Sequence, residues 1–180
     1  IYASTSKIYK NGISLNEKSL IAPQSTYAEN KLIAENFIRK NFDAYNIFRM
    51  SNVFSETNIA DGSFLDSVVR NLRKNKVCFD VCKSSLRDFI HIKNVSKAFF
   101  SSQALPTGIY NLSSNVGLRI DEIINSIISG NDIDHKNLTF SYGTDIRSQT
   151  LSNKKISDIL KFNKISSTEI LNKMSMINVK

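Results

Sequence analysis

Residues 25–50 read STYAENKLIAENFIRKNFDAYNIFRM. Leucine, isoleucine and phenylalanine recur at helical spacing through most of this stretch, and Ser25 is a suitable N-cap, so we expect a helix over 25–42. A short apolar run follows at 45–50, which indicates a strand. A helix that leads at once into a strand is typical of an α/β protein.

The same alternation continues on both sides of this stretch. Loops are expected at 6–24 and 58–62, where turn-forming residues gather. The expected strands are 1–5, 77–81, 89–91 and 109–112, with a short one starting at Phe140. The expected helices are 64–75, 95–105, 120–128, 154–160 and 167–174. The fold class is therefore predicted to be α/β.

The composition is that of a soluble globular domain. The chain has 180 residues, of which 41% are hydrophobic and 22% charged. It has no long apolar run and no signal-peptide pattern at its start, so we expect a cytoplasmic protein without a membrane span, with Cys78 and Cys82 reduced. His91 and His135 stand alone, so no metal site is expected.

The net charge of +8 raises the alternative of an RNA-binding module, which would bind RNA in a salt-dependent way. The basic residues are scattered, and no stretch interleaves them with a row of aromatic residues. We therefore expect no nucleic-acid partner. A basic excess also suits an anionic small ligand such as a nucleotide diphosphate, or it reflects a lysine-rich and asparagine-rich genome.

Tyr27 and Lys31 are the first candidates for chemistry. Four residues apart on a helix, they share one face. A phenol with an ordinary pKa of about 10 is a poor base at neutral pH, but a nearby cation favours the phenolate. Tyr27 is thereby a candidate acid/base for a sugar hydroxyl or ketone. On its own the pair is a weak signal, because a tyrosine on a buried helix face is usually part of a core.

Five segments strengthen this interpretation by their order. They are STSKIY at 4–9, PQSTY at 23–27, FRMSNVF at 48–54, LRDFIHI at 86–92 and GIYNL at 108–112. In this order they resemble the extended short-chain dehydrogenase/reductases, specifically the NAD-dependent epimerase/dehydratase family exemplified by UDP-glucose 4-epimerase. The resemblance covers nearly the whole chain.

The resemblance implies a catalytic triad of Thr5, Tyr27 and Lys31, with Ser4 as the neighbouring alternative to Thr5. It also implies that Tyr27, Lys31 and Ser4 contact the cofactor, NAD or NADP. The threonine hydroxyl would position the reacting oxygen, and the lysine would lower the pKa of the tyrosine.

For the substrate, a nucleotide-diphosphate sugar, the resemblance implies three further residues. Asn52 would touch the sugar nucleotide, and Arg87 would face its phosphates, where a planar guanidinium suits a diphosphate. Arg147 is a looser match to a second phosphate-side arginine. A structural ion pair between Arg87 and Asp88 is the alternative for that arginine.

The implied architecture is part of an NAD(P)-binding Rossmann-like fold followed by a smaller substrate domain. Residues 1–57 would complete the Rossmann-like domain, and 58–180 would bind the nucleotide sugar, with 85–112 returning in part to the sheet. The chain has no glycine-rich dinucleotide turn, so we expect it to be the C-terminal part of a longer enzyme, which the family likeness suggests is a homodimer.

The expected reaction is 4-epimerisation of the sugar. Dehydratases of this family place Asp-Glu directly after the catalytic threonine, where this chain has Ser6 and Lys7. Without an acid pair, a leaving hydroxyl lacks its usual proton donor. The alternatives are a nucleotide-sugar 4-keto reductase, a dehydratase, or a truncated inactive remnant of such an enzyme.

Overall fold

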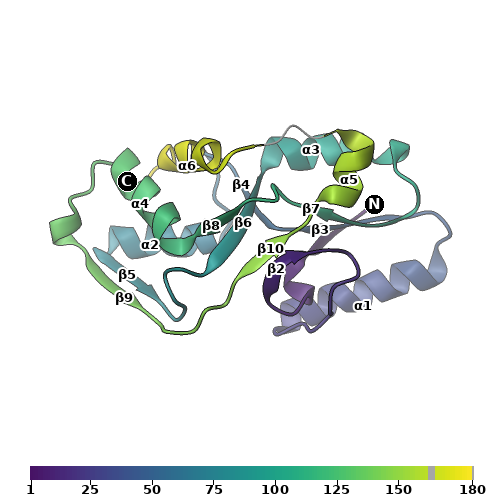
Figure 1. Ribbon diagram of the computed structural model, residues 1–180, viewed down its shortest axis with the longest axis horizontal. Coiled ribbons are helices and arrows are strands. Elements are labelled where there is room, and N and C mark those ends of the chain that lie inside the picture. Colours follow the sequence, from purple (N-terminus) through teal and green to yellow (C-terminus); the bar gives the residue numbers. More distant parts are fainter. Residues whose placement is uncertain (162–164, 180) are drawn as a thin grey trace.

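The computed structural model describes residues 1–161 and 165–179 of the chain. Figure 1 shows an elongated molecule in which a central sheet runs between two ends. One end carries α1, β1, β3 and β7, and the other carries α2, α4, β5 and β9. The features that matter for function lie where these two ends face each other.

A three-stranded parallel sheet forms the first end. It has the order β1 (Tyr2–Thr5), β3 (Asn46–Met50), β7 (Gly108–Leu112). In this sheet Thr5 of β1 pairs with Met50 of β3, and Met50 in turn pairs with Leu112 of β7. Within the described residues β1 pairs with β3 alone, so its other edge is open.

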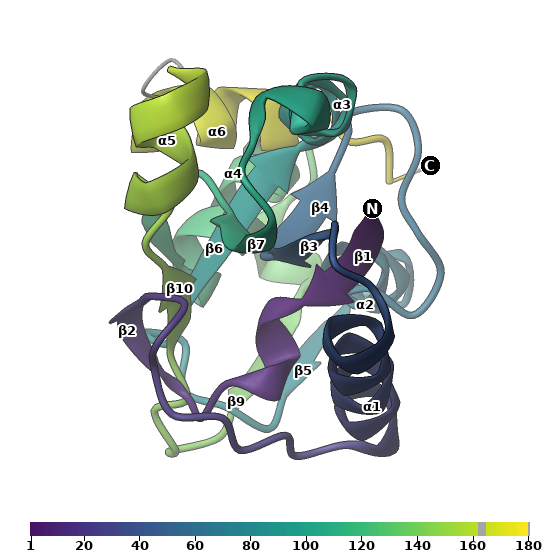
Figure 2. The same cartoon turned by 90° about the vertical axis from the view of Figure 1, so that its right-hand side faces the viewer.

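Helix α1 (Thr26–Asn41) packs along this sheet (Figure 2). The predicted cap is confirmed, because the Ser25 hydroxyl accepts a hydrogen bond from the Ala28 amide. The predicted helix over 25–42 and strand over 45–50 are confirmed to within a residue. The outer face of α1 leaves Ile33 and Phe37 exposed.

A five-stranded sheet crosses the middle of the molecule. Its order is β2-β10-β6-β4, and β8 pairs antiparallel with β6 while the other pairs are parallel. The strands are β2 (Gly12–Leu15), β10 (Gln149–Leu151), β6 (Leu86–His91), β4 (Asn52–Phe54) and β8 (Gly117–Arg119). Only Ser51 separates β3 from β4, so the chain passes directly from the first sheet into the second.

Helices α3 (Ile92–Phe100) and α5 (Lys154–Leu160) lie on the side of the first sheet opposite α1 (Figure 2). They cover a core cluster that includes Phe48, Tyr110 and Ile156. Because the helices bury one face against the sheet, their sequences are amphipathic and those of the strands are apolar. This pattern is what predicted the elements from the sequence.

The second end holds the largest apolar cluster, built around the isoleucines of one helix. Its elements are α2 (Phe64–Arg73), β5 (Lys76–Phe79), α4 (Ile120–Gly130), β9 (Thr139–Tyr142) and α6 (Ser167–Ser175). β5 and β9 form a separate two-stranded parallel sheet. Three short 3₁₀ helices complete the described elements: η1 (Ser6–Ile8), η2 (Ser102–Ala104) and η3 (His135–Asn137).

Several predictions are wrong: the strand expected over 89–91 begins at Leu86, the strand expected over 77–81 ends at Phe79, and β4, β8 and β10 were not predicted. The loop expected over 6–24 contains η1 and β2, because β2 pairs with β10, a partner more than a hundred residues away that the local sequence does not reveal. The helix expected over 95–105 begins at Ile92 and ends at Phe100. His91 caps its start by accepting a hydrogen bond from the Lys93 amide. Histidine is not among the usual N-cap residues, so the sequence did not indicate this start.

The domain limits at 57 and 58 stay predictions. Of the segment 85–112, β7 lies in the first sheet beside β3, whereas β6 lies in the five-stranded sheet. That segment therefore contributes to both sheets.

Two further properties of the described residues bear on function. Within them, no helix is both long enough and apolar enough to cross a bilayer. Their acidic, histidine and cysteine side chains form no group of three or more that could hold a metal ion. Cys78 and Cys82 are free thiols.

Candidate functional site

A cavity of about 720 Å³ opens between the two ends of the molecule. Its walls come from the N-terminal region of α1, from η1, from the central sheet and from α2 and β5. Of the substrate residues predicted from the sequence, Asn52, Arg87 and Arg147 all line it. Segments far apart in the sequence therefore meet around one space.

The α2 and β5 end of the cavity carries two phenylalanines among polar and charged residues that include Arg70 and Lys74. Phe64 and Phe79 line it, with ring centroids 5.4 Å apart. The hydroxyl of Ser67 and the amide of Asn71 add polar groups to the same wall. Phe64 lies in the helix predicted over 64–75 and Phe79 in the strand predicted over 77–81, and their place in the cavity was not foreseen because an aromatic residue in an apolar pattern resembles any core residue.

Two arginines line the middle of the cavity. Arg87 of β6 donates hydrogen bonds to the carbonyl oxygens of Leu86 and Arg147. The Arg147 guanidinium lies 3.1 Å from a carboxylate oxygen of Asp80. Burial lowers the pKa of Arg87, and the neighbouring Arg147 cation lowers it further. Two neighbouring guanidinium cations favour a bound anion, although the Asp80 carboxylate beside Arg147 offsets part of their charge.

The proposed ion pair between Arg87 and Asp88 does not form. Among the ion pairs between described residues, none joins these two side chains. Asp88 is buried and accepts hydrogen bonds from Ser114 and from the Leu151 amide instead. Successive side chains of a strand point to opposite faces, so the Asp88 carboxylate points away from the Arg87 guanidinium. Arg87 is therefore available to the cavity.

Asn52 lies on β4 beside these arginines. Its side-chain amide donates a hydrogen bond of 2.8 Å to the carbonyl oxygen of Asp88. This contact holds the Asn52 side chain against the cavity wall.

The opposite end of the cavity is lined by hydroxyl, amide and amine groups. They belong to Lys7, Tyr9, Asn11, Gln24 and Ser25. This end has no phenylalanine, whereas the α2 and β5 end adds Phe64 and Phe79 to its polar groups.

Hydrogen bonds and strand pairing establish the order of the three parts. Gln149 donates a 3.0 Å hydrogen bond to the carbonyl oxygen of Ser6 in η1. The same Gln149 pairs in register with Arg87 on the neighbouring strand. Arg147 then contacts Asp80, the residue after β5. The cavity therefore runs from the polar end, past the two arginines, to the α2 and β5 end.

The structure brings Tyr27 and Lys31 together. The Lys31 Nζ atom lies 5.8 Å from the centroid of the Tyr27 ring and 5.0 Å from that of Tyr2. It donates a hydrogen bond of 3.0 Å to the carbonyl oxygen of Ala3. Tyr27 is 55% exposed, so its ring is accessible rather than part of the core.

Thr5 ends β1 and begins η1. It is buried, and its Oγ1 atom accepts a hydrogen bond of 3.3 Å from the Lys7 amide. Thr5, Tyr27 and Lys31 do not themselves line the cavity, but Lys7 and Ser25, each two residues from a triad member, do. The triad residues thus lie beside the polar end of the cavity, and their catalytic roles stay predictions.

Ser4 points away from Thr5, as alternation along a strand requires. Its hydroxyl donates a buried hydrogen bond to Glu35 of α1. Ser4 therefore ties β1 to the helix that carries Tyr27 and Lys31. Its predicted cofactor contact remains untested.

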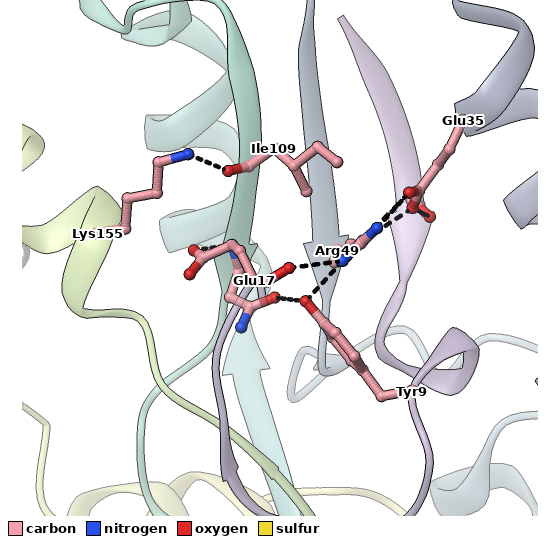
Figure 3. Close-up of polar contacts among 8 residues, drawn as sticks. Tyr9, Glu17, Glu35, Arg49, Ile109 and Lys155 are labelled. Carbon is pink, nitrogen blue, oxygen red and sulfur yellow. Dashed lines mark hydrogen bonds and ion pairs between the residues drawn. The ribbon is translucent and has the colours of Figure 1, made fainter. Parts of the chain in front are cut away.

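Glu35 belongs to a buried polar network that the sequence analysis missed (Figure 3). Its carboxylate pairs with Arg49 of β3 at 2.7 Å. Arg49 also donates to the Tyr9 hydroxyl at 3.0 Å, and that hydroxyl donates to Asn111 of β7 at 2.8 Å. The network links α1, η1 and two strands of the first sheet. The available signal was a glutamate and an arginine within otherwise apolar stretches.

The network shifts the titration of its members. Burial raises the pKa of Tyr9, although the Arg49 cation acts against this. Burial alone would lower the pKa of Arg49, but its hydrogen bonds to Glu35 and Tyr9 outweigh that effect and raise it. Arg49 is therefore held as a cation within the network.

Comparison with known proteins places this geometry in context. The family model described as "NAD dependent epimerase/dehydratase family" matches residues 1–113, more than half of the chain. A comparison with the curated proteins finds no match.

Several solved structures share the fold. MoeE5, solved with UDP-glucuronic acid and NAD, is 19% identical with a TM-score of 0.80, over 98% of this chain and 62% of that one. dTDP-glucose 4,6-dehydratase from Bacillus anthracis str. Ames is 17% identical with a TM-score of 0.76, over 97% and 60%. UDP-N-acetylglucosamine 4-epimerase from Methanobrevibacter ruminantium M1 is 20% identical with a TM-score of 0.75, over 98% and 60%.

These likenesses confirm the predicted fold class, an α/β arrangement that forms part of a Rossmann-like fold. The chain spans less than two thirds of the length of each of these three structures. On the match over residues 1–113, the chain belongs to the NAD-dependent epimerase/dehydratase family.

Proposed function

We propose that this chain is the substrate-binding and catalytic part of an NAD(P)-dependent nucleotide-sugar 4-epimerase. The three-part cavity is the observation that carries this proposal. The phenylalanine rings at its α2 and β5 end suit a nucleobase, its two arginines suit a diphosphate, and its polar end suits a sugar. The parts follow one another in the order in which those groups are joined in a nucleotide sugar.

The arginines support a diphosphate more strongly than any other anion. Arg87 and Arg147 both line the cavity, and the Arg87 guanidinium donates a hydrogen bond to the Arg147 backbone carbonyl, so the two residues are neighbours. A diphosphate offers oxygens on two adjacent phosphorus atoms, which such a pair can bind at once. Asn52 lines the same wall and offers its amide to the sugar nucleotide.

The cofactor would lie on the triad side of the molecule. β1 has an open edge among the described strands. A glycine-rich dinucleotide-binding segment, for which the longer similar structures have the length, would extend the parallel sheet at that edge. The exposed side chains of Ile1 and Phe100 line a hollow beside the start of β1 that such a half would cover. Bound NAD or NADP would supply the acceptor and donor of the hydride.

In the proposed reaction the protein residues move one proton. Tyr27 would accept the proton of the sugar hydroxyl and later return it to the same oxygen. Thr5 would donate a hydrogen bond to that oxygen, and Lys31 would hold its ammonium group beside the Tyr27 ring. The hydride chemistry at the sugar carbon would come from the bound cofactor, and its delivery to the opposite face would make the product the epimer.

The alternatives use the same residues. A 4-keto reductase would stop after one hydride transfer, and an inactive remnant would bind the nucleotide sugar without turning it over. A dehydratase also needs a proton donor for the leaving hydroxyl. Ser6 is buried and Lys7 is an amine, so the positions of the family's acid pair carry no carboxylate here. This favours epimerisation over dehydration.

We further propose a cytoplasmic homodimer that acts in polysaccharide biosynthesis. The exposed Ile33 and Phe37 on α1 support the dimer, because they are four residues apart and present one apolar face. Sedimentation of the chain and of a Phe37→Glu variant tests it. A dimer that the variant converts to a monomer is expected, and a wild-type monomer would contradict it.

Turnover tests the proposed function. The polypeptide that carries these residues together with its dinucleotide-binding half is incubated with NAD and a panel of UDP-, GDP- and dTDP-sugars, and the products are followed by NMR. We expect one sugar to be epimerised, Tyr27→Phe to abolish the reaction, and Ser129→Ala, at an exposed position on α4 that does not line the cavity, to leave it unchanged. Unchanged turnover in Tyr27→Phe would contradict the assigned role.

A further inference from the structure

Lys31 lies near two tyrosine rings, and the nearer of them has no part in the proposed reaction. The Lys31 Nζ atom lies 5.0 Å from the centroid of the Tyr2 ring and 5.8 Å from that of the Tyr27 ring. The same ammonium group donates a 3.0 Å hydrogen bond to the carbonyl oxygen of Ala3. β1 therefore supplies both the nearer ring and the hydrogen-bond acceptor of this lysine.

The Tyr2 side chain points toward α1. Tyr2 and Ser4 are two residues apart on β1, so their side chains share one face of the sheet. The Ser4 hydroxyl donates to Glu35 of α1, and Lys31 lies four residues before Glu35 on the same face of that helix. The Tyr2 ring, which is partly buried, thus lies between the strand that ends in Thr5 and the helix that carries Lys31.

The hydrogen bond to Ala3 is the more replaceable of the two β1 contacts. The Ser51 amide donates to the Leu112 carbonyl of β7, so odd-numbered residues along β3 bond to β7 and even-numbered ones bond to β1. Phe48, the register partner of Ala3, therefore bonds to the residues on either side of Ala3, and the Ala3 carbonyl faces the open edge of β1. A strand added at that edge would take this carbonyl oxygen for its own amide. The Tyr2 ring would then be the β1 contact that still holds the ammonium group.

Resting on the proposed function, we propose that Tyr2 is a positioning residue for the reaction: the face of its ring holds the Lys31 ammonium group beside Tyr27. An aromatic face attracts a cation through the electrons of the ring, and this attraction does not need the hydroxyl group. Burial raises the pKa of Tyr2, and the nearby Glu35 carboxylate and Tyr27 raise it further. Tyr2 therefore stays a neutral phenol, which leaves Tyr27 as the phenol that accepts the proton.

The experiment measures kcat and KM for the epimerised sugar, from about pH 6 to about pH 9, with the polypeptide that also carries the dinucleotide-binding half. Tyr2→Leu and Tyr2→Met remove the ring, and either one suffices if the other does not fold. Tyr2→Phe keeps the ring. Phe140→Leu, which replaces an exposed aromatic side chain of β9 outside the cavity, is the matched control. Urea unfolding establishes that each variant is folded under the assay conditions.

We expect Tyr2→Leu to lower kcat about tenfold and to leave the KM for the nucleotide sugar within about twofold, because the residues that line the cavity are unchanged. The acid limb of its kcat profile moves to higher pH, since a cation that is no longer held beside Tyr27 favours the phenolate less. Tyr2→Phe and Phe140→Leu keep the wild-type values.

Wild-type kinetics in Tyr2→Leu, together with an inactive Tyr27→Phe, overturns the role of Tyr2 and leaves the proposed function intact. A loss in Tyr2→Phe as large as that in Tyr2→Leu also overturns it, since the hydroxyl group and not the ring would then matter. A lower kcat with an unmoved pH profile does the same, because the ring would then serve only the packing of β1. Absence of turnover by the wild type with every sugar overturns the proposed function, and this inference with it.

Discussion

Glu35 of α1 and Arg49 of β3 form an ion pair that is almost wholly removed from solvent, with side chains 1% and 4% exposed. The pair fixes the helix that carries Tyr27 and Lys31 against the sheet that ends in Thr5. Ser4 donates a further hydrogen bond to Glu35, and the Tyr9 hydroxyl and the Glu17 carbonyl oxygen accept from Arg49 (Figure 3). The predicted triad thus depends on a structural network that contributes no group to the cavity other than Tyr9.

Removing one partner of this pair should destabilise the chain strongly. Arg49→Met leaves the Glu35 carboxylate buried without its cation, which costs about 3–5 kcal/mol of unfolding free energy. Urea denaturation measures the loss, and Asn36→Ala, at an exposed position next to Glu35 on α1, serves as the control. The double variant Glu35→Met/Arg49→Met should lose less than the sum of the two single variants. Strict additivity would mean that the two side chains do not interact.

Asp88 should make the chain less stable as the pH rises from about 4 to about 6. Burial raises its pKa to about 6, although hydrogen bonds from Ser114 and Leu151 act against this. The folded state therefore holds a proton that the unfolded state has released across this window, so stability is greatest below it and falls through it, by about 3 kcal/mol in all. Urea unfolding at intervals of pH measures this slope.

The amide of Asp88→Asn cannot ionise, so this variant should flatten the profile between pH 4 and 6. Asp61→Asn, which changes an exposed carboxylate, should keep the wild-type slope. A slope that persists in Asp88→Asn would assign it to another group.

Glu56 should act in the opposite direction and at lower pH. A hydrogen bond from His91, and then one from Lys173, lowers the pKa of Glu56 to about 2. Its stabilising effect is therefore present above about pH 4.5 and is lost as the pH falls toward 2. Glu56→Gln should make the acid limb of the stability profile less steep, as measured by circular dichroism during acid titration. Glu29→Gln, at an exposed position, should leave the limb unchanged, and the same slope in both variants would refute the assignment.

Gly130 should tolerate no side chain. A Cβ atom at this position would lie 1.8 Å from the carbonyl oxygen of Ser175, so α4 and α6 could not approach as they do. Gly130→Ala should cost about 1–3 kcal/mol or more in unfolding free energy, because backbone has to move to relieve the overlap. Ser129→Ala, at the exposed neighbouring position, should cost little. A stable Gly130→Ala variant would contradict this packing of the two helices.

Local patterns predicted most of the fold correctly. The cap at Ser25 and the limits of α5 follow from residues within a few positions of each other, and the structure confirms them. β2 and β10 were missed because each is short and is stabilised by pairing with distant segments rather than by its own apolar pattern. The start of α3 was misplaced because His91, an uncommon cap, replaces the serine or aspartate that marks most helix starts.

The substrate residues implied by the family likeness lie together in the structure and their roles stay predictions, whereas the supporting structure was not foreseen. Asn52, Arg87 and Arg147 are brought to one cavity as the family likeness implied. The contributions of Lys7 and Phe79 were not foreseen, since whether a lysine faces solvent or a cavity depends on the tertiary fold. The buried network of Glu35 and Arg49 was equally hidden, because burial of a charge is a property of packing and not of spacing.

Calorimetric titration of the chain with UDP-glucose is the most direct test that its cavity holds a nucleotide sugar. We predict one binding site per chain, weakened about tenfold or more in Arg87→Ala and unchanged in Arg39→Ala, which removes an exposed guanidinium from α1. No binding, or equal binding by wild type and Arg87→Ala, would contradict the account.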